Sequence, residues 1–134
     1  MAADAICIII AGVVRATLPS SEFTLAWQHS VEKTRWEERY RIDGGRLVLI
    51  EASVAGSGAG MEPAPGARLA NGRWSWRPAL PPLPVVRLAA SPYARDYELC
   101  WSGRCSPLGS LLGPVVADAT IELKACSGPA SNAR

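Results

Sequence analysis

The chain has 134 residues, a formal net charge of +2, 49% hydrophobic residues and 19% charged residues. This length fits one domain, and such a composition is that of a globular protein and not of an intrinsically disordered one. The arginines are scattered singly, without a basic patch or a base-stacking motif, so nucleic acid is not an expected partner. Five tryptophans in so short a chain favour half-buried strands or ligand-facing surfaces.

The first expected element is the apolar run from Ala5 to Val14. It is about ten residues long, whereas a helix needs about 20 apolar residues to span a bilayer. Asp4 precedes it, where a signal peptide would carry positive charge. We therefore expect a β-strand here, and an export signal would have to lie upstream or have been removed.

Apolar and polar residues alternate along most of the chain, and turn signals recur about every eight to twelve residues. This pattern predicts an all-β fold: an antiparallel β-sandwich or partly open barrel of about eight or nine strands. We expect a single domain over 1–126 and a flexible tail over 127–134. A short helix is expected at 108–112, and the prolines of 78–84 predict an extended connector. The expected strands lie near 5–14, 21–30, 35–43, 46–54, 73–77, 84–90, 95–101, 104–108 and 116–125.

Two neighbouring strands each carry an apolar row on one face. Side chains alternate between the faces of a strand, so the rows share a face only if paired residue numbers sum to an odd value. A four-residue turn over 31–34 satisfies this condition. It predicts that His29 lies opposite Trp36 and that Trp27 lies opposite Glu38. The two rows are Phe23, Leu25, Trp27 and His29 on the first strand, and Trp36, Glu38, Tyr40 and Ile42 on the second.

The segment Asp43-Gly44-Gly45-Arg46 is a strong hairpin signal. With the glycines at its centre, Ile42 faces Leu47 and Glu38 faces Glu51. Two carboxylates side by side destabilise a strand pair and need a partner. A shared proton, an arginine, a metal ion or a ligand would supply it.

The strand over 46–54 runs back toward the 31–34 turn and enters a glycine-rich segment, 56–62, at that end of the sheet. Such a loop brings backbone N–H groups close to a bound group. We therefore expect one binding site at this end. The alternatives are a structural His29, carboxylates paired with arginines, and a glycine segment that only connects strands. The candidate site residues are His29, Ser30, Glu32, Lys33, Trp36, Glu38, Glu51, Gly56, Ser57, Gly58, Gly60 and Glu62.

The four cysteines suit an oxidising compartment. Ser102-Gly103 forms a good two-residue turn, which places Cys100 opposite Cys105 and predicts a cross-strand disulfide. Cys7 and Cys126 lie in the first and last expected strands and could pair if those strands are neighbours. A zinc site is not expected, because the spacing is unsuitable and the chain has a single histidine.

Catalysis is a weaker hypothesis than binding. A serine hydrolase would need Ser57 activated by His29, since Ser30 points to the opposite face of its strand. The glycine segment is no phosphate-binding motif, because neither Lys-Ser/Thr nor a helix follows it. A metal- or carbohydrate-binding module that uses the carboxylates and tryptophans is the main alternative to a partner- or solute-binding protein. We expect no cofactor and no catalytic residue.

The stretch FTLAWQHSVEKTRWEE, from Phe23 to Glu38, resembles the signature of a bacterial family called domain of unknown function 1850. The blocks EASVAGSGAGMEP (51–63), RPALPPLP (77–84) and ELCWSGRC (98–105) are similar to its later segments. One departure is Ala55, where the family's pattern leads us to expect lysine.

The resemblance implies a setting beside TRAP transporters of the TAXI type, whose solute receptors work outside the cytoplasmic membrane. It implies an accessory protein without a known activity that is periplasmic, or attached to the membrane on its periplasmic side. Together with the residues, this leads us to expect a non-enzymatic protein that binds a partner or a small solute at the His29 end of the sandwich. The expected partners are the transporter's membrane subunit, the TAXI solute receptor or a small solute.

Overall fold

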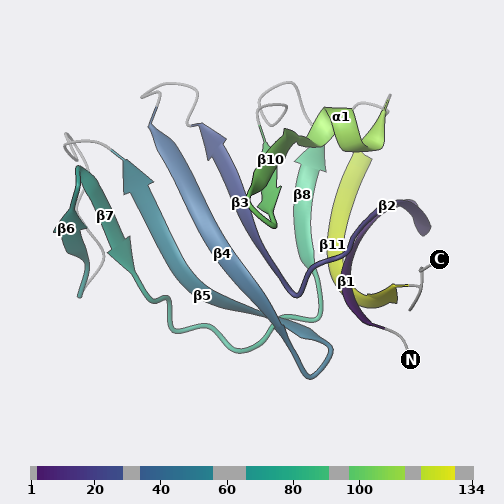
Figure 1. Ribbon diagram of the computed structural model, residues 1–134, viewed down its shortest axis with the longest axis horizontal. Helices are drawn as coiled ribbons and strands as arrows, with labels where there is room; N and C mark the ends of the chain where they lie inside the picture. Colours follow the sequence, from purple (N-terminus) through teal and green to yellow (C-terminus); the bar gives the residue numbers. More distant parts are fainter. Residues whose placement is uncertain (1–2, 29–33, 56–65, 91–96, 114–118, 129–134) are drawn as a thin grey trace.

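The computed structural model describes residues 3–28, 34–55, 66–90, 97–113 and 119–128, which form two antiparallel sheets and one short helix, α1 (Leu108–Leu112). The sheets face each other without closing into a barrel, so the predicted sandwich is confirmed (Figure 1). The smaller sheet has the order β2 (Val13–Leu18), β1 (Ala3–Ile10), β11 (Ala119–Gly128) and β8 (Val86–Ala90). The larger has the order β10 (Arg104–Pro107), β9 (Glu98–Trp101), β3 (Glu22–Gln28), β4 (Arg35–Asp43), β5 (Arg46–Ala55), β7 (Arg73–Trp76) and β6 (Arg68–Ala70).

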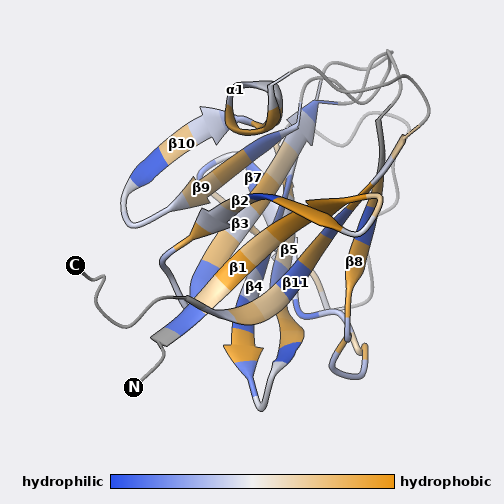
Figure 2. Ribbon diagram, turned by 90° about the vertical axis from the view of Figure 1, so that its right-hand side faces the viewer, coloured by the Kyte–Doolittle hydropathy of each residue, from blue (hydrophilic) through white to orange (hydrophobic). Residues whose placement is uncertain are grey.

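The core lies between the two sheets. Ile6 and Ile8 of β1 and Leu123 of β11 point toward Leu25 of β3 and Leu99 of β9, and all five are at most 1% exposed. Figure 2 shows how consistently hydrophobic β1 is along most of its length. This central strand of the small sheet is therefore the part of the sequence with the least alternation, as burial on both sides requires.

The described part of the chain has eleven strands, two more than predicted. The run expected as one strand over 5–14 is broken by a tight turn at Ala11-Gly12, where both residues have positive φ. The chain then returns as β2, whose pattern of small and branched residues gave no separate signal. The other unexpected strand is β6, a three-residue edge strand that pairs with β7.

The larger sheet extends beyond the smaller one. The strands β7 and β6 lie away from the four-stranded sheet in Figure 1, whereas Leu47 and Leu49 of β5 belong to the core. The proline-rich connector has the expected extended form, and Leu83 within it makes an isolated antiparallel bridge with Leu47. Ser127 and Gly128 belong to β11, so that strand reaches into the predicted tail; the remainder of the tail lies outside the described residues.

Both disulfides are present. Cys100 and Cys105 are direct partners across the β9–β10 hairpin, as predicted, with Cα atoms 3.9 Å apart. Cys7 and Cys126 join the first and last strands, with Cα atoms 5.9 Å apart, because β1 and β11 are neighbours. Among the described residues, no helix is long and apolar enough to cross a membrane.

Candidate functional site

The inner face of β3 and β4 carries the apolar rows that the parity argument predicted. Their register differs by two residues from the expected one. Trp27 lies opposite Trp36 and Leu25 opposite Glu38. Both predicted pairs, His29 with Trp36 and Trp27 with Glu38, are therefore wrong. The last described pair before the connection is Gln28 with Arg35, the end of β3 and the start of β4. A register shift of two residues keeps the sum of paired residue numbers odd. The two apolar rows therefore still lie on the same face of the sheet.

The predicted pairing of Glu38 with Glu51 is also wrong. The β4–β5 hairpin starts as expected, with Ile42 opposite Leu47, but the register shifts between Tyr40 and Arg39. Ile50 is the extra residue of a β-bulge in β5, and beyond it every side chain is on the face opposite to the expected one. Glu51 therefore lies on the outer face, where its Oε1 is 3.3 Å from Nη1 of Arg39.

Of the predicted site residues, the structure describes Trp36, Glu38 and Glu51. Trp36 and Glu38 share the inner face, and Glu51 does not. The described ends of β3, β4 and β5 do lie at one end of the sheet, as predicted, since Trp36 pairs with both Trp27 and Val54 (Figure 1, top). The remaining nine lie outside the described residues: His29, Ser30, Glu32, Lys33, Gly56, Ser57, Gly58, Gly60 and Glu62. The hydrolase hypothesis, which needs His29 and Ser57, lies outside them as well.

Four aromatic rings gather at this end of the inner face, and we call Trp27, Trp36, Trp76 and Tyr97 the aromatic cluster. The rings of Trp27 and Trp36 are nearly parallel, with centroids 6.3 Å apart. Tyr97 tilts against Trp27 at 5.9 Å, and Trp76 meets Trp36 edge-on at 6.3 Å. All four rings are partly exposed, which suits a surface that a ligand can cover. Sequence reasoning missed Trp76, at the end of β7, and Tyr97, directly before β9, because both are far in the chain from β3 and β4.

Glu38 is the one charged side chain placed among these rings by the described strands. Pairing across the large sheet sets it in a row with Leu25 on one side and Ala52 on the other, and then Trp76 beyond Ala52. Its Oε1 accepts a hydrogen bond of 2.7 Å from the hydroxyl of Tyr40. Within the described part of the chain, no lysine or arginine forms an ion pair with it.

One buried donor belongs to the residue two positions before Glu38, on the same face of β4. The indole Nε1 of Trp36 is buried and has no hydrogen-bond acceptor among the described residues. A buried donor without an acceptor costs about 1–3 kcal/mol. Because this N–H is buried, a ligand at the surface does not reach it, whereas Glu38 is half-buried and its carboxylate has one donor among the described residues.

The tyrosines around Glu38 have raised pKa values. Burial raises the pKa of Tyr40, and the hydrogen bond to the Glu38 carboxylate raises it further. Burial also raises the pKa of Tyr97, with a second contribution from the negative charge of Glu38. Both phenols therefore keep their protons above the pH at which a free tyrosine ionises, and Tyr40 remains a hydrogen-bond donor.

We expect the free energy of unfolding to fall as the pH rises above the ordinary tyrosine pKa of 10.0. Because the folded-state pKa of Tyr40 is the higher one, the unfolded chain releases this proton first, and the stabilisation present below pH 10 is lost above it. Urea unfolding between about pH 8 and about pH 11 measures this slope. Tyr40→Phe should flatten it, leaving the part due to Tyr97; an unchanged slope would contradict the assignment.

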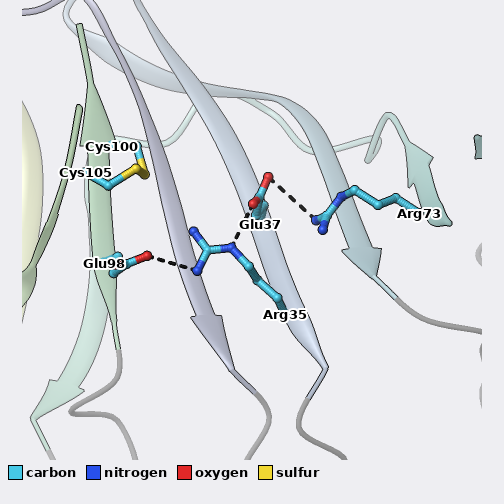
Figure 3. Close-up of a disulfide and its surroundings, with 6 residues drawn as sticks. All are labelled: Arg35, Glu37, Arg73, Glu98, Cys100 and Cys105. Atoms are coloured by element: carbon cyan, nitrogen blue, oxygen red, sulfur yellow. Dashed lines mark hydrogen bonds and ion pairs between the residues drawn. A yellow bond between two sulfur atoms is a disulfide. The ribbon is translucent and has the colours of Figure 1, made fainter. Parts of the chain in front are cut away.

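The outer face of the same strands carries charges that are paired. Arg35 of β4 donates to Glu37 and lies 2.9 Å from Glu98 of β9, and the hydrogen bond to Glu37 raises its pKa (Figure 3). Arg73 of β7 lies 3.6 Å from Glu37 and donates to Ser53 at 2.8 Å. These half-exposed pairs tie β9, β4, β5 and β7 together, and each contributes little to stability alone.

A shallow cleft of about 510 Å³ lies on the outer face beside the Cys100–Cys105 disulfide, lined also by Thr24, Arg39 and Trp101. Its openness to solvent and its mixed lining give no preference for a particular ligand. Among the described residues, no group of three His, Cys, Asp or Glu side chains could hold a metal ion. With Glu51 on the outer face, the cation site suggested by the Glu38–Glu51 pair has lost one of its two ligands.

The comparisons with known proteins place the chain in a family. Searches of curated proteins and of solved structures found no match. The family model described as "Domain of unknown function (DUF1850)" matches residues 23–108, which is more than half of the chain and spans the described segments from β3 to the start of α1. The chain therefore belongs to the DUF1850 family.

Proposed function

We propose that this protein is a non-enzymatic accessory component of a TAXI-type TRAP solute uptake system and binds a small solute or a partner at the inner-face site. The observation that carries the binding role is the aromatic cluster around Glu38, at the end of the sheet where β3, β4 and β5 meet. The association with TAXI-type transporters is an inference from the family resemblance of the sequence signatures.

The periplasm is the compartment that we propose for it. All four cysteines are in disulfides, one of them joining the first and last strands. Structural disulfides form and persist in oxidising compartments and are rare in the cytosol. This supports a location facing the periplasm, either free or held at the membrane by the transporter.

The arrangement of the inner face supports binding more than catalysis. Partly exposed rings and a carboxylate held by the Tyr40 hydroxyl can orient a ligand by stacking and hydrogen bonding. The tryptophans also favour a second candidate, a carbohydrate-binding module, because flat rings stack on sugars. A carbohydrate-binding module does not depend on the Glu38–Glu51 pair, which the structure separates, and it would use the same aromatic cluster.

Purification of the tagged chain from native membranes in a mild detergent tests the transporter association. We expect the TRAP membrane subunit or the TAXI receptor to co-purify, and a tagged unrelated periplasmic protein serves as the control. Trp76→Ala and the outer-face variant Ser75→Ala form a matched pair from adjacent positions of β7. If the site engages the partner, Trp76→Ala alone should reduce recovery; a cytoplasmic chain, or one without transporter subunits, would contradict the proposal.

A further inference from the structure

We propose that the inner-face site takes an organic cation, a ligand with an ammonium or guanidinium group, bound between the aromatic cluster and Glu38. This inference rests on the proposed solute-binding function and names the chemical class of the solute. Its first support is a contrast among carboxylates. Among the half-buried carboxylates, Glu37, Glu51, Glu98 and Glu122 all form ion pairs with arginines, whereas Glu38 has none among the described residues. The exposed carboxylates of Asp4, Glu22 and Asp43 form none there either, but water solvates them.

The sequence of β4 explains why none of the arginines of this strand pairs with Glu38. This strand carries three arginines, Arg35, Arg39 and Arg41, all at odd positions, which place them on the outer face. Glu38 is at an even position and faces inward, with Trp36 and Tyr40 two residues away on either side. A carboxylate in such surroundings needs a countercharge or several donors, and the described residues supply one hydroxyl.

The aromatic cluster supplies the second half of the recognition. A cation over the face of a tryptophan or tyrosine is attracted by the ring's quadrupole, most strongly where water is excluded. Trp27, Trp36 and Tyr97 present rings in two orientations, and Trp76 adds a third edge-on to Trp36. Strand pairing places Glu38 close to the cluster, two residues from Trp36 on the same face and in the row that ends at Trp76. Rings and charge thus favour the same ligand.

Other ligand classes fit less well. A metal ion would need several oxygen ligands, and Glu38 is the single carboxylate that the described strands bring to this face. A neutral sugar would stack on the rings but would leave the Glu38 charge uncompensated.

The test is a calorimetric titration of the oxidised full chain with choline, with agmatine as the guanidinium probe, and with 3,3-dimethylbutan-1-ol, the uncharged counterpart of choline. Glucose serves as the sugar probe. We expect at least one of the two cations to bind. The uncharged alcohol should have an affinity at least about tenfold lower than that of choline. Glu38→Gln retains an acceptor for Tyr40 and should weaken cation binding about tenfold. The control Glu51→Gln, on the outer face, should leave the affinity unchanged.

Each outcome decides a separate question. Equal affinity for choline and its uncharged counterpart, or no effect of Glu38→Gln, would overturn the assignment of an organic cation as the ligand. The proposed solute-binding function would still stand in that case. Binding of glucose alone would favour the carbohydrate module. If neither cation binds at about 10 mM, the proposal also fails. The co-purification experiment does not depend on any of these ligands, so the transporter association stands or falls separately.

Discussion

Replacing both Cys7 and Cys126 with alanine should lower the free energy of unfolding by about 5 kcal/mol, the largest effect that we expect from any pair of substitutions. The two cysteines are 119 residues apart in sequence, and the chain-entropy cost that a disulfide removes from the unfolded state grows with the length of the closed loop. The bond also links the neighbouring strands β1 and β11 on the face of the smaller sheet that points away from the core.

The second disulfide provides the matched control. Cys100 and Cys105 are 5 residues apart, so the same relation gives about 2 kcal/mol for their double alanine variant. Urea unfolding of the two double variants and the oxidised protein measures both values. Equal losses from the two variants would contradict the loop-length account. Full alkylation of all four cysteines in protein prepared under oxidising conditions would contradict the disulfides themselves.

Leu25→Ala should destabilise the fold by about 2–5 kcal/mol. Leu25 is 1% exposed at the centre of β3, with Leu99 and Glu38 as its neighbours across the sheet. Removing its side chain leaves a cavity between the two sheets, next to its cross-strand partner Glu38. The control is Leu69→Ala on edge strand β6, where the side chain is 57% exposed. It should change the stability by no more than about 0.5 kcal/mol. A loss below about 1 kcal/mol for Leu25→Ala would contradict its place in the core.

Much of the fold was predictable because local chemistry decides it. The Gly44-Gly45 and Ser102-Gly103 turns have positive φ at both positions, and each fixes the register of its hairpin at the first pairs. From those turns, alternation correctly places Trp36, Glu38 and Tyr40 on one face. The Ala11-Gly12 turn has the same backbone conformation. An alanine at its first position is a weaker signal, so β2 was not expected as a separate strand.

The parts of the site that sequence did not predict depend on non-local geometry. A β-bulge inserts one residue into a ladder, and Ile50 gives no local sign that it does so. That single residue separates Glu51 from Glu38 and turns an expected carboxylate pair into an isolated carboxylate. Trp76 and Tyr97 join the aromatic cluster only because β7 and β9 lie in the same sheet as β3 and β4. The order of the strands in the larger sheet brings these two residues to the cluster, and local turn signals do not predict that order.

The pairing of β1 with β11 also determines when this protein can fold. The small sheet has β1 at its centre, and the strand that pairs along the whole of β1 is completed only at Gly128. Until that segment has emerged from the ribosome or an export channel, the isoleucines of β1 have no second neighbouring strand and remain exposed. Contacts of such large sequence separation slow folding and lengthen the time spent prone to aggregation. Folding must therefore wait for the last strand, an order of events that is compatible with crossing a membrane as an unfolded chain.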